Sequence, residues 1–113
     1  MAERRMFSKS ITESDDFINL SKEAQSLYFH LCMYADDDGF INNAKSIIRG
    51  IDANNNELEE LKINHYINEF PSGIILIIHW KIHNYIQKDR YKQTSCIEEK
   101  NQVELINSIY VLK

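Results

Sequence analysis

Apolar residues between Ser21 and Trp80 follow three helical stretches in succession and then a strand, a turn and a second strand. In the first stretch they recur every three or four positions, at Ala24, Leu27, Tyr28, Leu31, Cys32 and Ala35. This is the spacing of one helix face, so it predicts a helix over 22–35. Ser21 precedes it as a favourable N-cap, and Glu23 in the first turn is favoured by the helix dipole.

A second helix is expected after Asn42 or Asn43, either of which can cap it. Its inner face consists of Ala44, Ile47, Ile48 and Ile51. A third helix begins near Asn54, which stands with Glu57 at the spacing of a capping box. The side chains expected on its core side are Leu58, Leu61 and the stem of Lys62. The helix is expected to end in a left-handed residue at Asn64-His65.

The pattern then changes to strands over 66–70 and 74–80, joined by a turn at Pro71-Ser72-Gly73. The second strand is apolar on both faces, which predicts helices against one face and a terminal segment against the other. Three helices followed by a hairpin predict a winged helix-turn-helix, an α+β fold that is mainly α with a small β-hairpin. Proteins of this fold usually bind duplex DNA.

The chain has 113 residues, 43% of them apolar, which suits one domain with a single core. We expect an N-terminal arm over 1–20, whose first twelve residues form a short strand or an extended segment. The winged-helix core is expected over 21–80. A basic-aromatic segment and a C-terminal extension make up 81–113, where a helix over 98–107 and a strand over 108–112 are both open.

The net charge of −4 argues against a simple DNA binder, because phosphate contacts supply most non-specific affinity. The charge is uneven, however. Residues 81–92 hold four basic residues against Asp89 alone, and Arg4, Arg5 and Lys9 form a second basic cluster. Aromatic residues alternate with basic residues over 79–92, a composition that suits phosphate contact and stacking on sugars or nucleobases. In the alternative interpretation the charges are merely solvated while Trp80, Ile82, Tyr85 and Ile86 pack, and both can hold at once.

The third helix is the one expected to approach a major groove. Its outward residues are Asn55, Asn56, Glu59, Glu60 and Asn64. Asparagine can pair with adenine edges, whereas a glutamate carboxylate is repelled by phosphates. The turn at 71–73 contains no basic residue. The candidate DNA-binding residues are Arg4, Arg5, Lys9, Asn55, Asn56, Lys62, Lys81, Asn84, Lys88, Arg90 and Lys92.

No motif indicates catalysis, a cofactor or a metal site, so an enzyme is not expected. His79 and His83 lack the glutamate and the helical context of a zinc-binding HExxH motif and are expected to be structural. The run Asp36-Asp37-Asp38-Gly39 lacks the ligand alternation of a calcium loop and is expected to be a solvated loop that ends the first helix.

The two cysteines, Cys32 and Cys96, are expected to be free, with Cys32 buried. The longest apolar run, 73–78, is too short to cross a bilayer, so no membrane contact is expected. The N-terminus has no apolar core of a signal peptide, which favours a cytoplasmic location.

Three stretches together resemble the N-terminal domain of phage replisome organizers, replication-initiation proteins of phages and prophages of Gram-positive bacteria that are DnaD-like in role. The stretches are residues 2–9 (AERRMFSK), 35–43 (ADDDGFINN) and 79–92 (HWKIHNYIQKDRYK). The resemblance covers about residues 1–100. It implies a winged-helix domain that binds the phage origin in a bacterial host and helps to organise helicase loading. The chain departs from the family pattern by stopping at Lys113 and by having Gln93 where proline is common.

These observations favour a DNA-binding module in phage or prophage replication initiation. Its expected partners are DNA and replication proteins such as a helicase or helicase loader, with a homo-oligomer also open. The main alternative is a protein-interaction or self-assembly module of a primosome, which the acidic third helix favours. A winged-helix transcriptional regulator uses the same fold.

Overall fold

The computed structural model describes residues 4–113, so residues 1–3 of the predicted arm, which include Ala2 and Glu3 of the first motif, lie outside the described residues. The helices are α1 (Lys9–Thr12), α2 (Asp15–Ile18), α3 (Lys22–Tyr34), α4 (Ala44–Gly50), α5 (Asn55–Ile63), α6 (Trp80–His83) and α7 (Ile97–Lys100). The strands are β1 (Phe40–Ile41), β2 (Ile67–Glu69), β3 (Ile75–Ile77), β4 (Val103–Ile106) and β5 (Ile109–Leu112).

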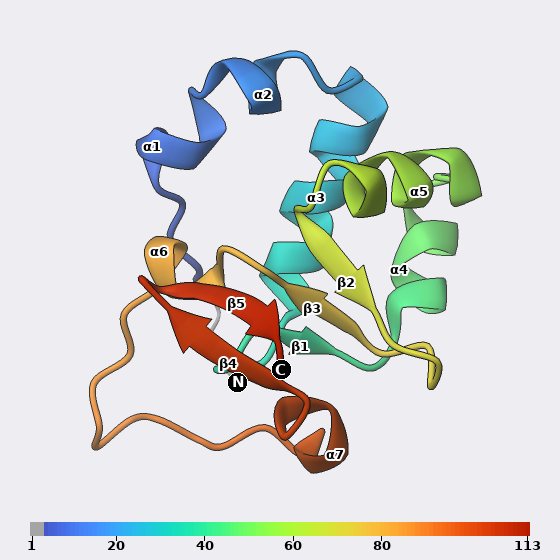
Figure 1. Ribbon diagram of the computed structural model, residues 1–113. Coiled ribbons are helices and arrows are strands. Elements are labelled where there is room, and N and C mark those ends of the chain that lie inside the picture. The colour runs from blue at the N-terminus through green and yellow to red at the C-terminus, as the bar shows by residue number, and fades with distance from the viewer. Residues whose placement is uncertain (1–3) are drawn as a thin grey trace.

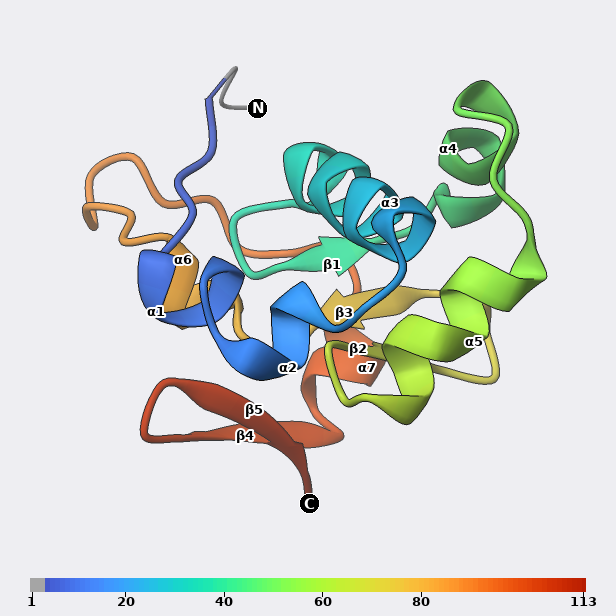
Figure 2. The same cartoon turned by 90° about the horizontal axis from the view of Figure 1, so that it is seen from above.

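The elements form a mixed α+β domain in layers, which agrees with the expected class (Figure 1). Strands β1, β3 and β2 make an antiparallel sheet in that order, and β4 and β5 form a separate hairpin. Seen from above, the sheet lies between the layer of α3 and the β4–β5 hairpin (Figure 2). The sheet is therefore covered on both faces, which explains why β3 is apolar throughout.

Leu27, Leu31, Ile47, Leu61 and Trp80 lie together in one buried core, as the spacing predicts. Leu31 and Trp80 are wholly inaccessible to solvent. Helix α3 matches its predicted range to within one residue, and the Ser21 side chain caps it by accepting from the Ala24 N–H at 3.1 Å. Local periodicity and a local cap are enough to define this helix.

Glu60 is not an outward residue of α5, contrary to the prediction. Its carboxylate accepts from the backbone N–H and from the hydroxyl of Ser21, both at 2.7 Å, and so ties α5 to the start of α3. The capping box is also wrong, because the Asn54 side chain accepts from the Asn56 N–H and a Glu57 oxygen is buried without a partner. The left-handed exit is confirmed at His65, whose φ is +64°.

Two predicted segments differ in part from the structure: the N-terminal arm, expected as a short strand or an extended segment, and the second strand of the hairpin. Residues 9–12 of the arm form α1, because the Ser8 side chain accepts from the Ser10 N–H and caps a helical turn. The strand predicted over 74–80 ends at Ile77, and Trp80 begins α6. The Trp80 indole N–H donates to the carbonyl of Asp37 at 3.0 Å, a distant contact that turns the chain away from the sheet.

The C-terminal residues, whose secondary structure the sequence left open, form the short helix α7 and the β4–β5 hairpin. Asn107 and Ser108 both have positive φ, the geometry of a tight hairpin turn. The Tyr110 N–H donates to the carbonyl of Ile78 at 3.1 Å, and the Tyr110 ring lies 6.1 Å from that of Phe40. The hairpin is thus the terminal segment that covers the second face of the sheet.

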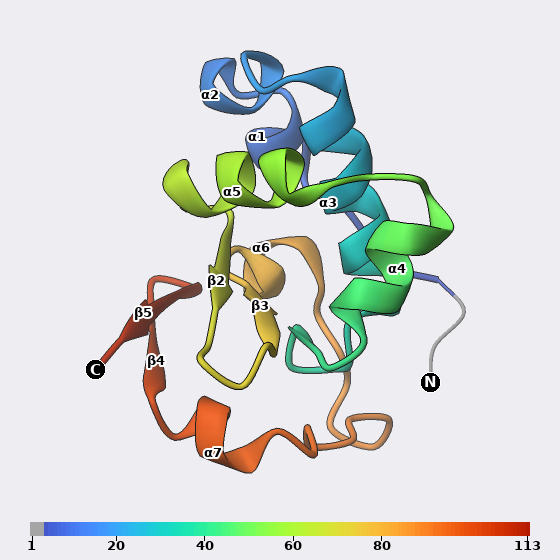
Figure 3. The ribbon, with the colours of Figure 1, turned by 90° about the vertical axis from the view of Figure 1, so that its right-hand side faces the viewer.

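Helix α7 lies below the turn between β2 and β3 (Figure 3), where the Ser72 hydroxyl donates to Glu99 at 2.9 Å. Within residues 4–113, no helix combines the length and the apolar character needed to cross a membrane.

Candidate nucleic-acid interface

The turn after α3, Asp36–Gly39, is a built structure; we call it the aspartate turn. Asp36 accepts from the backbone N–H groups of Asp38 and Phe40, each at 3.0 Å, which fixes the turn on itself. A second Asp36 oxygen accepts from the hydroxyl of Thr94, 58 residues further along the chain. The expectation of a solvated loop is therefore wrong.

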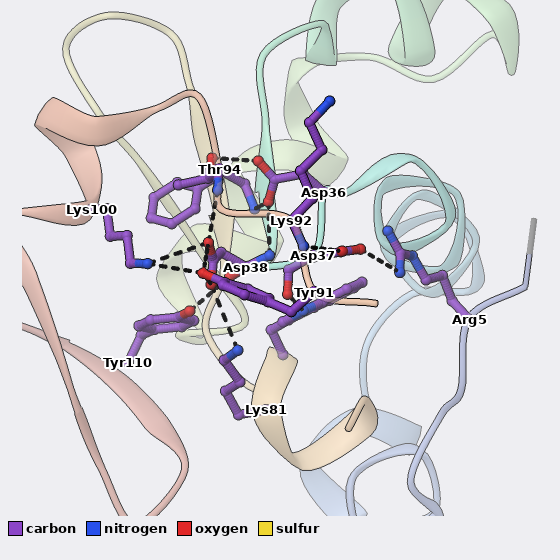
Figure 4. Close-up of polar contacts among 12 residues, drawn as sticks. Arg5, Asp36, Asp37, Asp38, Lys81, Tyr91, Lys92, Thr94, Lys100 and Tyr110 are labelled. Atoms are coloured by element: carbon purple, nitrogen blue, oxygen red, sulfur yellow. Dashed lines mark hydrogen bonds and ion pairs between the residues drawn. The ribbon is translucent and has the colours of Figure 1, made fainter. Parts of the chain in front are cut away.

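Asp38, only 2% exposed, is the centre of this turn (Figure 4). The Tyr91 hydroxyl lies 2.8 and 2.7 Å from its two oxygens, and the Thr94 N–H donates at 2.9 Å. The ammonium groups of Lys100 and Lys81 lie 3.4 and 3.7 Å away. Burial alone raises the pKa of Asp38, but these hydrogen bonds and charges outweigh burial and hold the pKa below its ordinary value. Asp38 is therefore ionised at neutral pH.

Asp37 attaches the N-terminal segment to the same turn. The Arg5 guanidinium donates to Asp37 at 3.3 Å and to the carbonyl of Ala35 at 2.7 Å, and it lies 5.0 Å from the centroid of the Trp80 ring. The Lys92 backbone N–H donates to the other Asp37 oxygen at 3.0 Å. One turn thus holds two chain segments, 4–6 and 91–100, that are distant in sequence.

Four of the predicted DNA-binding side chains contact other residues of the protein. The Arg5 side chain is only 2% exposed, and Lys81 pairs with Asp38. Asn84 is buried and accepts from the Met6 N–H at 2.8 Å. The Lys62 ammonium group lies 3.0 Å from the carboxylate of Glu59 on α5 and 2.9 Å from that of Glu69 on β2. These four side chains therefore have structural contacts of their own, and their role in DNA binding stays a prediction.

The other basic residues predicted to bind DNA are exposed, and several of them lie close together in the structure. Arg4, Arg90 and Lys92 line one groove of about 830 Å³, with Arg5 and Asn84 among its walls. The two basic clusters, separated by more than seventy positions in sequence, thus meet at one site. Lys88 is exposed outside the residues that line the groove, and Lys9 lies on α1. Asn55 and Asn56 are exposed at the start of α5, apart from the groove.

Tyr85 does not pack, contrary to the alternative in which it anchors the segment. Its side chain is 79% exposed on the groove, whereas Trp80 is fully buried and Ile86 is half-buried. The anchors of this segment are instead Trp80, His83 and Asn84. The alternation of aromatic and basic residues could not distinguish the ring that faces the core from the ring that faces solvent.

His83 is a structural histidine, as expected. Its Nδ1 accepts from the Ser8 N–H at 2.8 Å, and its Nε2 lies 2.7 Å from the Tyr28 hydroxyl. Burial and the neighbouring His79 lower the pKa of His83 to about 4. A neutral ring with its proton on Nε2 then satisfies both contacts. Among residues 4–113 no three metal-ligating side chains gather into one cluster.

Cys32 and Cys96 are both free and buried, which confirms the sequence-based expectation. Burial raises the pKa of both thiols, so neither has the character of a reactive thiolate.

Comparison with known proteins adds no relative: no family model, no curated protein and no solved structure matches the chain.

Proposed function

We propose that this chain is a winged-helix DNA-binding module of a phage or prophage replication-initiation protein. In this proposal it acts in the cytoplasm of the bacterial host and carries no catalytic activity. The argument rests on the topology of the sheet, on the basic groove and on the residue stretches that resemble replisome organizers.

The strand order carries the proposal. In a winged helix, the strand between the first and second helices pairs with the returning strand of the hairpin. Here β1 lies between α3 and α4 in sequence and pairs with β3 through Phe40–Leu76 and Ile41–Ile75. Helices α4 and α5 then correspond to the helix-turn-helix pair, and the β2–β3 turn corresponds to the wing.

The exposed surface of α5 carries less unpaired negative charge than its composition suggests. Glu60 turns inward to Ser21, and Glu59 is paired with Lys62 at 3.0 Å. Asn55 and Asn56 remain exposed at the N-terminal end of α5, the part of a recognition helix that contacts base edges. The net repulsion between this helix and phosphates is therefore smaller than the sequence predicts.

Titration of the full chain against duplex DNA at two salt concentrations tests the proposal. We expect affinity to fall steeply as salt rises, because phosphate contacts release counterions. Replacing Lys88 and Arg90 together by alanine should weaken binding about equally for all sequences and reduce the salt slope by up to about two units. Lys81→Ala is a matched comparison, because Lys81 already pairs with Asp38 and should change the slope less.

Glu59→Lys should strengthen binding if α5 approaches the phosphate backbone. No duplex binding at low salt, with the fold intact, would contradict the proposal. Unchanged affinity in the Lys88/Arg90 double variant would remove the basic segment from the DNA surface.

A second candidate function is a protein-interaction module that contacts a helicase loader or another copy of the chain. The observation that favours it is the apolar surface of the C-terminal hairpin, where Leu105, Ile106 and Leu112 are 47%, 50% and 61% exposed. Leu105 and Leu112 share one face of the hairpin and Ile106 lies on the other, and exposed apolar side chains of this kind are available for contact with a partner. The wing turn, Pro71–Gly73, also has no basic residue that could bind a phosphate.

A further inference from the structure

The groove between the N-terminal segment and the segment 84–95 has a chemistry of its own. Its lining includes four basic residues, Arg4, Arg5, Arg90 and Lys92, and two acidic ones, Asp36 and Asp37. This local excess of positive charge has the opposite sign to the chain's net charge of −4. A groove of this kind concentrates anions against the overall field of the protein.

The acidic residues of the groove are already occupied. Asp37 accepts from Arg5 and from the Lys92 N–H, while Asp36 accepts from Thr94 and from two backbone N–H groups. Three exposed basic residues, Arg4, Arg90 and Lys92, are available to bind an anion. The charges that face solvent at the rim are therefore those that attract phosphate.

Tyr85 gives the groove a stacking platform. Its ring is 79% exposed, while the preceding residue, Asn84, is buried and fixed by its N–H to the Trp80 carbonyl at 2.9 Å. The Asn84 side chain also holds the opposite wall through the Met6 N–H at 2.8 Å. An exposed aromatic ring on a fixed backbone loses little entropy when a base stacks on it.

The volume of the groove and the exposed Tyr85 ring both suit unpaired nucleotides. The groove volume of about 830 Å³ is that of a small-molecule site, which has room for unpaired nucleotides. The bases of a double helix are already paired and stacked, so they cannot stack on Tyr85 without leaving the helix.

We propose that this groove binds a single strand of DNA, with a base stacked on Tyr85 and the backbone phosphates on Arg4, Arg90 and Lys92. The inference rests on the proposed DNA-binding function and adds a second, single-strand site distinct from α5. A module with both sites holds the duplex and an adjoining unpaired strand at once.

Fluorescence anisotropy of the full chain with a short labelled oligothymidylate, and separately with a duplex, tests the inference. Tyr85→Ala should weaken oligothymidylate binding about fivefold or more, because stacking contributes about 1–3 kcal/mol per base. Tyr85→Phe should retain binding, since phenylalanine keeps the ring. Tyr34→Ala is the matched control, because Tyr34 is also exposed, at 51%, and lies outside the groove lining.

The complementary variant replaces Asn55 and Asn56 by alanine; it should weaken duplex binding and leave oligothymidylate binding unchanged. If the protein binds duplex but not oligothymidylate, or if Tyr85→Ala changes nothing, the groove inference is overturned and the proposed function stands. If neither DNA binds, both are overturned. Loss of binding in Tyr85→Phe would overturn the stacking role. Circular dichroism of each variant confirms that it folds.

Discussion

Gly39 has a backbone that other residues rarely adopt and no room for a side chain. Its φ is +93°, and a Cβ atom there would lie 2.6 Å from Cγ of the Trp80 ring. The aspartate turn and the start of α6 therefore fit together only if this position lacks a Cβ. The glycine allows the turn to approach Trp80, which in turn donates to the carbonyl of Asp37.

Gly39→Ala should lower the free energy of unfolding by about 2 kcal/mol or more, because it adds a steric clash to a strained φ. Urea denaturation measures this loss. Gly50→Ala is the control: nothing lies within 4 Å of a Cβ built there, and Gly50 is the last residue of α4. It should be neutral or stabilise by up to about 1 kcal/mol. Equal effects of the two substitutions would contradict the packing argument.

His83 predicts a dependence of stability on pH. Its pKa is about 4 when folded against an ordinary value of 6.5, so the unfolded chain binds more protons between these values. Stability is therefore retained above pH 6.5 and falls as the pH drops toward 4, by no more than about 3 kcal/mol. His79 is half-buried, and burial lowers its pKa as well.

Unfolding of the wild type and of His83→Gln, compared from pH 7 to pH 4.5, isolates this contribution. The destabilisation caused by His83→Gln should shrink as the pH falls, because the wild type loses its advantage. A difference that is independent of pH would show that His83 does not titrate as described.

At the scale of elements, sequence reasoning succeeded where the determining contacts are local. Helix α3 follows from apolar periodicity and from Ser21, which caps it from the adjacent position. The end of β3 could not be predicted in this way, because the apolar run from Ile74 to Trp80 has no period and is interrupted by a contact between Trp80 and Asp37, 43 residues apart.

The candidate site shows the same division. Composition identified the basic residues of the groove. Which of them are not paired with a carboxylate depends on acidic residues far away in sequence. Lys81 and Arg90 look alike in the sequence, yet Lys81 pairs with Asp38 and Arg90 remains exposed on the groove. No local pattern links Asp38 to Tyr91, 53 residues further along, and the run of three aspartates resembled a solvated loop for that reason.

Asp38→Ala should release residues 91–100 from the aspartate turn. It removes the acceptor of the Tyr91 hydroxyl and of the Thr94 N–H, at a cost of about 1–3 kcal/mol. Hydrogen exchange should show faster exchange of the Thr94 amide, with less change in α3. Asp89→Ala serves as the control, because Asp89 is exposed in the same segment. Unchanged protection at Thr94 would contradict the anchoring role of Asp38.

At the scale of the whole molecule, the apolar C-terminal hairpin predicts self-association through a terminal segment rather than through α5. Sedimentation across a concentration range should show a larger species at high concentration. Leu112→Lys should reduce that species, whereas Ile63→Lys should not, although Ile63 on α5 is 70% exposed and Leu112 is 61% exposed. A monomer at all concentrations would contradict this prediction.

The stretch from Tyr85 to Arg90 is held at both ends, and between them it contains one backbone hydrogen bond, from the Arg90 N–H to the Gln87 carbonyl at 2.9 Å. Asn84 fixes its start, and Tyr91 joins its end to the buried Asp38. Since closing a somewhat longer loop between fixed ends costs little, the stretch can change in length and composition while the core stays the same. Ligand preference and fold are thus encoded in separate residues, so this loop is a natural place for related chains to diverge and a practical place to graft a new recognition sequence.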